Sequence, residues 1–368
     1  MHSGFSAVLV SAAFVAGVAG SGKAQATDLI PKHQYKFQPE GILLNKEKAE
    51  KPEGVSGIAC MPPAAAGVRR CLAINDERRK AQFIEIDNAR IRPGEDVELI
   101  GKEASDDTLG RRPKATCPEG AGDFDNLDGE GASYSEPYFY VVGSHGCSRK
   151  GGEFKLSAFI LARVRVDAEG KPLGKAETTY RLSDVLKLES PVNPYFGKAL
   201  MKKDGDAAEP NGLNIEGIAV VANQVFVGLR APFDKQGDSF LVKARVDDLF
   251  ARQSGAEQAP STQAVSEIVP LPLGANTGIR DLATLPDGRL LILAGPAQTQ
   301  PEPYSLFILD PSDKSSLKKL GVLKTSSGAN EDAKAEAVTL LGPDRVLILF
   351  DSVLNGGPRE YALPSALY

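Results

Sequence analysis

The sequence predicts an all-β fold: a β-propeller of five blades in a single domain, closed by an N-terminal strand that completes the last blade. Three observations predict it. A strand-turn-strand phrase recurs five times, its length is nearly constant, and strand-like segments without a partner stand at both ends of the chain. Six or seven blades stay open as alternatives, because the intervals between the copies are uneven.

The repeated phrase opens with a carboxylate in four of its five copies. From this residue to the polar or glycine residue that closes the second strand, the interval is 14 or 15 residues in four copies and 20 in the first. A hairpin register demands such constancy, because a slip by one residue would turn every side chain to the opposite face. The copies open at Ser56, Glu130, Glu216, Asp281 and Glu336.

Further strand-like sequence follows each hairpin, which gives about four strands per repeat, the content of a propeller blade. The last copy has one strand too few before the chain stops. The segment "HQYKFQP" at 33–39 precedes the first copy and has no blade of its own. We therefore expect this segment to complete the last blade.

The first residues have the form of an export signal. An apolar run at 7–19 leads to small residues that end in Ala24-Gln25-Ala26, the pattern of a signal-peptidase site. We expect residues 1–26 to be a signal peptide and residues 27–368 to form the mature domain, periplasmic or secreted. The apolar run is too short to cross a bilayer, so no membrane span is expected.

Four cysteines agree with export, because an even number in an exported chain usually means disulfides. Cys60 and Cys71 flank a hairpin turn, and Cys117 and Cys147 flank the next repeat, so local pairing is the simplest of the three possible connectivities. A zinc site is a poor alternative, because there is no C-x-x-C spacing and only two histidines follow the expected signal peptide.

The composition excludes several classes of function. With 42% hydrophobic and 25% charged residues and a formal net charge of -5, nothing suggests a nucleic-acid partner or a disordered tail. The 37 glycines and 25 prolines favour a β-rich fold with many turns. There is no G-x-S-x-G elbow, no H-E-x-x-H helix and no nucleotide-binding loop. A redox quinoprotein propeller would carry tryptophan-rich motifs, and this chain has no Trp.

The phrases "LDGEGAS", "NIEGIAV", "GIRDLATLPDGRLLILAG" and "AEAVTLL" resemble the family catalogued as domain of unknown function 3616, mostly exported bacterial proteins. The resemblance covers nearly the whole mature chain and implies little chemistry, since that family has no established function. The "EG(I/A)A" openings at Glu130 and Glu216 are similar, more loosely, to the esterase-like phytase family.

Propeller geometry would gather the opening residues in one place. The first strand of each blade lines the central channel, and hairpin pairing brings the end of the second strand to the same mouth. Several carboxylates there would repel one another unless a positive group lies among them. The candidates are Glu130, Glu216, Asp281 and Glu336 in one ring, Asp76, His145, Arg230 and Asp351 in an adjacent ring, and Asp128 and Arg280 just before two openings.

One hypothesis is a metal site, because hard oxygen ligands from several blades suit Ca²⁺ better than zinc or copper. With Ca²⁺ as cofactor, the protein could hydrolyse a phosphate or an ester, with Glu130 or His145 as general base. The expected metal ligands are Glu216, Asp281, Glu336 and Asp351. The side chains expected to bind a ligand are Arg230, Arg280, Asp76 and Asp128.

Two other interpretations stay open. The ring could be a binding module for a cation, a sugar or a partner peptide, in a protein that we expect to be a monomer. Alternatively, the acids could only accept backbone N–H bonds from the neighbouring blade and help to fix the closure. The glycine after Glu130 and Glu216 favours this structural role for them, whereas Asp281 and Glu336 carry no such indication.

Overall fold

The chain is seen here in a computed structural model. Apart from Met1, the expected signal peptide lies outside the described residues. Within the described part, no helix is long and apolar enough to cross a membrane. The structure describes residues 1, 27–38, 54–64, 67–88, 90–148, 152–188, 190–200, 212–234, 236–252, 267–324 and 333–364.

Five sheets of antiparallel hairpin-linked strands follow one another along the chain, and we number them blades I to V. Blade I consists of β4 (Val55–Cys60), β5 (Arg69–Asn75), β6 (Lys80–Asp87) and β7 (Arg90–Glu98). Blade II consists of β9 (Gly129–Ser135), β10 (Tyr138–Gly143), β12 (Leu161–Arg165) and β13 (Glu177–Thr179). Blade III consists of β14 (Asn214–Val221), β15 (Gln224–Phe233), β16 (Asp238–Arg245) and β17 (Glu267–Pro272). Blade IV consists of β18 (Thr277–Thr284), β19 (Leu290–Pro296), β20 (Ser305–Asp310) and β21 (Asp313–Leu323). Blade V consists of β22 (Lys334–Gly342), β23 (Arg345–Asp351) and β24 (Arg359–Ala362).

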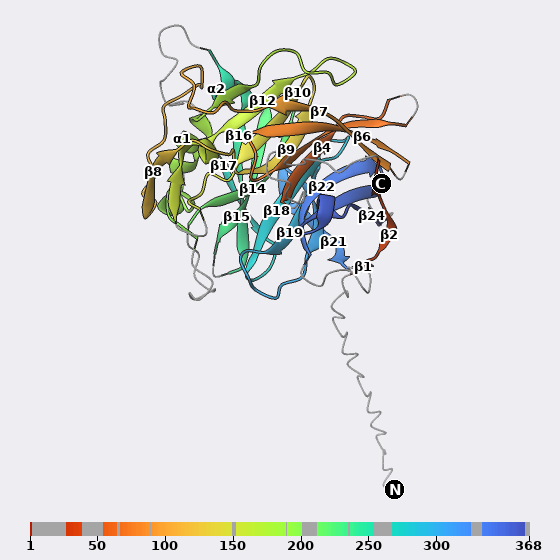
Figure 1. Ribbon diagram of the computed structural model, residues 1–368. Helices are drawn as coiled ribbons and strands as arrows, with labels where there is room; N and C mark the ends of the chain where they lie inside the picture. Colours follow the sequence, from red (N-terminus) through yellow and green to blue (C-terminus); the bar gives the residue numbers. More distant parts are fainter. Residues whose placement is uncertain are drawn as a thin grey trace.

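The first strands of the five blades form a closed ring. Each of β4, β9, β14 and β18 contacts the next, and β22 contacts both β18 and β4. In Figure 1 these five strands surround the middle of the molecule, and the later strands of each blade lie outside them. The predicted five-bladed propeller is therefore confirmed.

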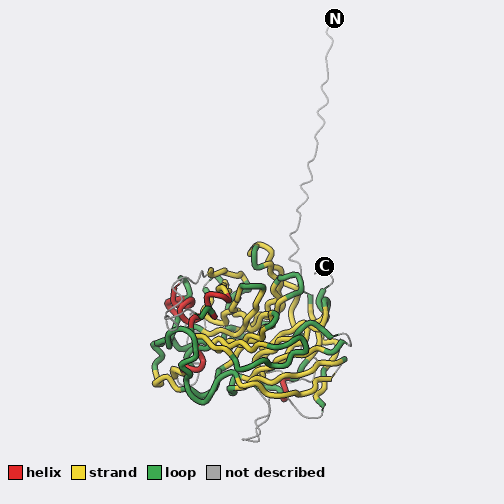
Figure 2. Tube along the Cα trace, turned by 90° about the horizontal axis from the view of Figure 1, so that it is seen from above, coloured by secondary structure: helices red, strands yellow, loops and turns green. Residues whose placement is uncertain are grey.

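The helical segments are short, and most of them lie at one side of the strands, with one apart from the others (Figure 2). Arg181, at the start of α1, donates from Nη1 to the carbonyl oxygens of Asp248 (3.3 Å) and Ala251 (2.7 Å), and so caps the end of α2. A two-stranded parallel sheet of β8 (Glu119–Asp123) and β11 (Glu153–Lys155) lies outside the blades. The helices are α1 (Arg181–Leu188), α2 (Val246–Phe250), η1 (Leu156–Phe159), η2 (Asn193–Tyr195) and η3 (Leu354–Gly356).

The first two strands of the blades are largely buried, because they pack between neighbouring blades. In β14 every residue up to Val220 is buried, and in β19 every residue up to Gly295. Strands covered on both faces read as continuous apolar runs rather than alternating ones. Between blades I and II, Phe83 and Phe139 meet edge to face with ring centroids 5.8 Å apart. The hydrophobic openings of the repeats thus reflect packing between blades.

An N-terminal strand completes blade V as predicted, but it consists of residues 31–34 rather than 33–39, and the same segment also extends two other blades. β2 (Pro31–Gln34) pairs antiparallel with β24, the outermost strand that blade V itself supplies. Immediately before it, β1 (Asp28–Leu29) pairs parallel with β21 of blade IV. Immediately after it, β3 (Lys36–Phe37) pairs parallel with β7 of blade I. One short segment therefore joins the last two blades to the first.

Both predicted disulfides are confirmed. Cys60 and Cys71 are bonded across β4 and β5, where they face each other in the register of the hairpin. Cys117 is bonded to Cys147 across 30 residues of sequence. No free cysteine remains among the described residues.

We expect Gly321→Ala to weaken the closure of the propeller. A Cβ on Gly321 would lie 2.4 Å from the carbonyl oxygen of Thr27 and 2.7 Å from Cγ of Leu29, so the N-terminal segment would have to move away from blade IV. Overpacking of this kind costs about 1–3 kcal/mol in the free energy of unfolding, which urea denaturation would measure.

Gly101→Ala is the matched control. A Cβ on Gly101 would meet no atom closer than 3.6 Å, so its free energy of unfolding should stay within about 0.5 kcal/mol of the wild type. Equal stability of the two variants would contradict a role of the N-terminal segment in closure.

Candidate functional site at the channel mouth

The opening position of each repeat is a β-bulge. In β14, Ile215 pairs with Leu229 and Gly217 pairs with Gly228, so that Glu216 between them has no cross-strand partner. The same irregularity recurs at the same place in all five hairpins, and a bulge of this kind re-aims the unpaired side chain. The unpaired residues are Ser56, Glu130, Glu216, Arg280 and Glu336.

The alignment of the fourth copy on Asp281 was therefore wrong by one residue. Ile279 pairs with Ala294 and Asp281 pairs with Leu293, which leaves Arg280 at the bulge. The ring of bulge residues thus contains three acids, one serine and one arginine. We call the end of the channel where these residues lie the channel mouth.

Asp281 is fully buried and links two blades through the main chain. Its Oδ2 accepts a hydrogen bond from the N–H of Val338 in blade V (2.7 Å), and its Oδ1 accepts one from the N–H of Leu282 (2.8 Å). Burial raises the pKa of Asp281 well above its ordinary value, and these two hydrogen bonds oppose that rise. The structural role considered for the ring acids is thus performed by Asp281.

The glycines that follow Glu130 and Glu216 allow the inner strands to approach closely, as their position suggested. A Cβ on Gly131 would lie 2.9 Å from the nitrogen of Ile218 in the next blade. A Cβ on Gly217 would lie 2.8 Å from Cα of Asp281. Real Cβ atoms do not approach this near, so only glycine fits here.

Four charged side chains form what we call the charged quartet: Glu216, Arg230, Arg280 and Glu336. Arg280 has an exposed fraction of only 1%, and its Nη2 lies 3.1 Å from Oε2 of Glu216 and also bonds Oε1 of Glu336. Arg230 binds the other oxygen of Glu216 from Nη1 (2.6 Å) and donates from Nε to the carbonyl oxygen of Ala297 (2.6 Å). The quartet therefore joins blades III, IV and V and is balanced in charge.

The pKa shifts in the quartet agree with these pairings. Burial lowers the pKa of Arg280, but the attraction of Glu216 and Glu336 more than reverses this, so its pKa lies above the ordinary value. Burial raises the pKa of Glu336, and Arg280 opposes that rise. Arg280 is thus a permanent cation at the mouth.

Three further carboxyl groups lie on the side of blades I and II, and we call Asp76, Asp128 and Glu130 the acidic trio. Burial, followed by repulsion from Asp128 and Glu336, raises the pKa of Asp76 to about 8. Burial, followed by repulsion from Glu216, Asp128 and Asp76, raises the pKa of Glu130 well above its ordinary 4.5. Among the described residues, Oδ1 of Asp76 is buried without a hydrogen-bond partner.

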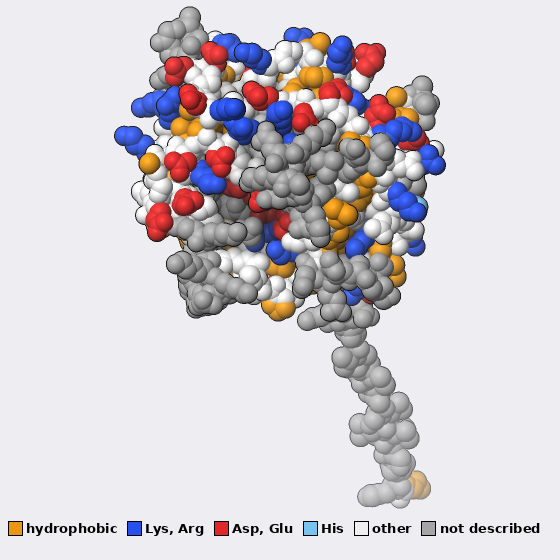
Figure 3. Space-filling model, viewed as in Figure 1, with side chains coloured by type: hydrophobic (Ala, Val, Ile, Leu, Met, Phe, Trp, Pro, Cys, Tyr) orange, Lys and Arg blue, Asp and Glu red, His pale blue; other side chains and the backbone are white. Residues whose placement is uncertain are grey.

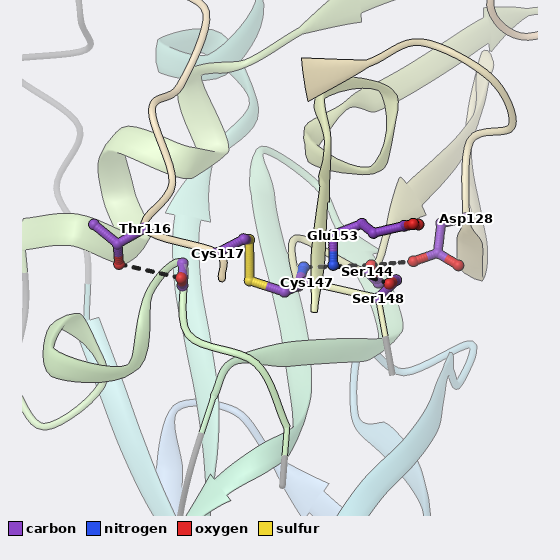
Figure 4. Close-up of a disulfide and its surroundings, with 9 residues drawn as sticks. Thr116, Cys117, Asp128, Ser144, Cys147, Ser148 and Glu153 are labelled. Carbon is purple, nitrogen blue, oxygen red and sulfur yellow. Dashed lines mark hydrogen bonds between the residues drawn. A yellow bond between two sulfur atoms is a disulfide. The ribbon is translucent and has the colours of Figure 1, made fainter. Parts of the chain in front are cut away.

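Asp128 stands just before β9 with a left-handed backbone (φ 49°). Its Oδ2 accepts a hydrogen bond from Oγ of Ser144, at the end of β10 (Figure 4). Asp351 ends β23, where Nζ of Lys334 lies 3.5 Å from its Oδ2. Figure 3, which views the same face as Figure 1, shows acidic side chains and a few basic ones close together near its middle.

His145 does not turn toward the acids. It is fully buried, its Nδ1 lies 2.9 Å from the carbonyl oxygen of Gly143, and its ring packs against Phe159 with centroids 5.7 Å apart. Burial lowers the pKa of His145 to about 4, and the charged group that affects it is Lys187 rather than a ring acid. His145 is therefore neutral at pH 7, and the structure does not bring it together with Glu130.

Two residues at the mouth lie outside the sequence-based candidates. Tyr304 precedes β20, and its ring lies against Gly295, whose Cβ would come within 2.4 Å of it. The four members of the charged quartet all influence the pKa of its phenol, which burial raises. The other residue is Ser144. Ser144 lies within the second copy of the repeated phrase, directly before His145, but it was not chosen as a candidate. Tyr304 lies outside the phrase, and a small residue at the end of the second strand was the only available signal for it.

Within the ranges that the structure describes, no group of three His, Cys, Asp or Glu side chains is arranged to hold a metal ion. At the mouth, the two arginines of the charged quartet balance its two acids, whereas the acidic trio lies on the other side.

Solved structures with similar folds share little sequence with the chain, and no curated protein matches it. A protein of unknown function from Dyadobacter fermentans has a TM-score of 0.41 and 10% identity, covering 92% of this chain and 98% of its own. A protein from Lactobacillus plantarum and a putative 6-phosphogluconolactonase from Bacteroides uniformis each have a TM-score of 0.33 over 80% of this chain, with 12% and 9% identity. The chain spans 64% of the length of each of these two.

One protein family matches over residues 162–356, which include the outer part of blade II, all of blades III and IV and the first two strands of blade V. This match is shorter than the resemblance seen in the motifs, which extended over nearly the whole mature chain, but it still covers more than half of the sequence. The looser similarity to the esterase-like phytase family stays a prediction. The chain belongs to the family described as Protein of unknown function (DUF3616).

Proposed function

We propose that the protein is a binding module whose channel mouth takes up a cationic ligand, either Ca²⁺ or the ammonium group of a small molecule or peptide. One observation carries this proposal: the charges at the mouth are unevenly balanced. The acids of the charged quartet have Arg230 and Arg280 as partners. In the acidic trio, burial and other carboxylates dominate the shifts of Asp76 and Glu130.

Asp76 and Glu130 have the raised pKa values that are expected where carboxyl groups lack a cation. Carboxylates held close together in a partly desolvated site cannot all be ionised at once, so their pKa values rise. Asp76 and Glu130 show this rise, and Oδ1 of Asp76 has no hydrogen-bond partner in the described part of the chain. A bound cation would favour the ionised carboxylates and satisfy that oxygen.

The donors are all hard oxygen atoms, which suit Ca²⁺ and ammonium groups better than zinc or copper. Glu216 and Glu336 already bind arginines, and Asp281 already accepts two N–H groups. We therefore assign the cation to Asp76, Asp128 and Glu130 rather than to the ligand set expected from the sequence. Glu336, whose charge raises the pKa of Asp76, would border the cation.

We further propose that the protein acts in the periplasm or outside the cell. Two disulfides are typical of proteins that fold in an oxidising compartment. Calcium sites of extracellular modules bind weakly, with dissociation constants of about 10⁻⁴–10⁻³ M. Such an affinity does not require that the ligands be fully arranged before the ion binds.

Calorimetric titration with Ca²⁺ and, separately, with ethylenediammonium tests the proposal and distinguishes the two kinds of cation. The pKa of Asp76 is about 8, so at pH 6 a cation must displace its proton. We expect the affinity to rise from pH 6 to pH 8.5, by at most about tenfold per pH unit for each proton displaced. The rise should level off above pH 8 as far as Asp76 is concerned.

The wild type with a chelator is the control for the Ca²⁺ arm, and zinc is the control for donor type. Absence of binding heat for both cations at every pH from 6 to 8.5 would contradict the proposed function.

A second prediction concerns the protein without ligand. Folding raises the pKa of Asp76 from 3.8 to about 8, so the folded state holds this proton more tightly than the unfolded chain. Wild-type stability should therefore fall as the pH rises from about 4 to about 8. Asp76→Asn stays neutral, so we expect its melting temperature at pH 8 to exceed that of the wild type by roughly 2–4 °C.

The two melting temperatures should converge as the pH falls below about 4, because the wild-type side chain is then protonated when folded and increasingly so when unfolded. Asp107→Asn, at an exposed position, serves as the control and should follow the wild type. A lower melting temperature for Asp76→Asn than for the wild type at pH 8 would show that the charged form of Asp76 stabilises the fold.

One observation favours a second function, hydrolysis of a phosphate or ester. Burial and neighbouring carboxylates raise the pKa of Glu130, and such a carboxyl can donate a proton to a leaving group. The neutral, buried His145 has no part in this candidate. Turnover of p-nitrophenyl phosphate or acetate by the wild type, and its loss in Glu130→Gln with unchanged melting, would identify an enzyme.

A further inference from the structure

A short loop connects one acid of the trio to a disulfide. The hydroxyl of Ser144 donates to Oδ2 of Asp128, and its N–H donates to the carbonyl oxygen of Asp128 (2.9 Å). Three residues later, Cys147 is bonded to Cys117. Figure 4 shows the disulfide, Ser144 and Asp128 in one region of the structure.

The disulfide closes a loop of chain that contains both partners of this hydrogen bond. Asp128 and Ser144 both lie between Cys117 and Cys147, on the two strands of the β9 and β10 hairpin or next to them. Cys117 leads through β8 to Asp128, and Cys147 comes three residues after Ser144. Any change in the cross-link therefore acts on both ends of the contact.

The main chain of the loop is specified by several contacts. The N–H of His145 donates to the carbonyl oxygen of Ala158 (3.0 Å), and the N–H of Gly146 donates to the hydroxyl of Ser144 (3.3 Å). His145 has a left-handed backbone (φ 51°), which costs about 1 kcal/mol or more in a residue other than glycine and persists only where its surroundings hold it. A Cβ on Gly146 would lie 2.6 Å from the carbonyl oxygen of Leu213, so the loop also packs tightly against blade III.

The other disulfide has no such connection. Cys60 and Cys71 lie opposite each other near the turn of the first hairpin, whereas Asp76 follows the opposite end of β5. The two disulfides are alike in burial, because each joins a partly exposed cysteine, Cys60 or Cys117, to a buried one. The chain therefore contains its own matched control.

We propose that the Cys117–Cys147 disulfide regulates the channel mouth. When it is intact, Ser144 holds Asp128 in place for the cation, and when it is reduced, the cation binds more weakly. Reduction by a dithiol transfers two electrons and two protons to the pair, gives two thiols, and oxidises the dithiol to its own disulfide. This inference rests on the proposed function, because it concerns the same cation.

The test measures Ca²⁺ and ethylenediammonium affinity by calorimetry in oxidised full-length mature protein. Cys117→Ala/Cys147→Ala and Ser144→Ala should each weaken binding by about tenfold or more, since a hydrogen bond to a charged group contributes that much to an equilibrium constant. Cys60→Ala/Cys71→Ala should change affinity by less than about twofold. Equal losses in the two disulfide variants, or none in either, would overturn the inference.

A double-mutant cycle separates positioning from general stability. If Ser144 acts through Asp128, then Ser144→Ala should have no further effect on affinity in an Asp128→Asn background. A full additional loss there would overturn the inference. The single substitution at Ser144 keeps this test available even if Cys117→Ala/Cys147→Ala does not fold.

Amide hydrogen exchange without ligand distinguishes failure of this inference from failure of the proposed function. The amides of Ser144 and Gly146 should exchange at least about tenfold faster in Cys117→Ala/Cys147→Ala than in the wild type. Their exchange rates should be unchanged in Cys60→Ala/Cys71→Ala. If the wild type binds neither cation, the proposed function fails, and exchange alone decides whether the disulfide holds Asp128. Unchanged exchange in both variants would overturn the inference.

Discussion

The ion pairs of Arg280 with Glu216 and Glu336 are the constraint on which the channel depends. A guanidinium group with 1% exposure lies between carboxylates from the two neighbouring blades. Burying such a charge is costly unless it is paired and hydrogen-bonded, and removing one partner leaves an uncompensated charge. These pairs form only when β14, β18 and β22 keep both their register and their order around the ring. The buried charges therefore favour this one order and register of the blades over other arrangements of the ring.

The same pairs decide what the rest of the mouth can do. Arg280 and Arg230 offset Glu216 and Glu336, so no cation of the quartet is left for Asp76, Asp128 and Glu130 on the far side. Burial and neighbouring carboxylates instead raise the pKa of Glu130 and that of Asp76, the latter to about 8. The bulges place Glu130, Glu216, Arg280 and Glu336 at one end of the channel, and the adjoining hairpin positions bring Arg230, Asp76 and Asp128 to the same end. Closure and ligand binding thus depend on one repeated irregularity of the backbone.

The fold could be predicted from the sequence because its signals are local. Hairpin length, turn residues and apolar runs recur along the chain, and they led to the five blades, the N-terminal strand and both disulfides. The candidate site was harder to predict. Arg280 and Asp281 are adjacent and both charged, and only the cross-strand register shows which of them is unpaired at the bulge. A bulge changes the face of the sheet to which the side chains point, and the amino-acid composition of the strand does not reveal this change.

The second ring shows the same limit. His145 follows Glu130 in the sequence by the interval that the repeat predicts. However, its backbone is left-handed where the chain leaves β10, and its imidazole packs against Phe159. Ser144 and Tyr304 reach the mouth through contacts between loops, which no repeat encodes. The positions of residues at or next to the bulges could be predicted to within one residue. The residues that reach the mouth from loops could not be predicted.

The pH dependence of stability in Arg280→Met tests the central role of Arg280 most directly. Without the guanidinium group, the pKa values of Glu216 and Glu336 in the folded state should rise, so the loss of stability should be full at high pH and shrink as these groups become protonated. We expect a deficit in the free energy of unfolding of about 3–5 kcal/mol at pH 7.5 and less than about half of that at pH 5. A deficit below about 1 kcal/mol, or one that is equal at both pH values, would contradict this account.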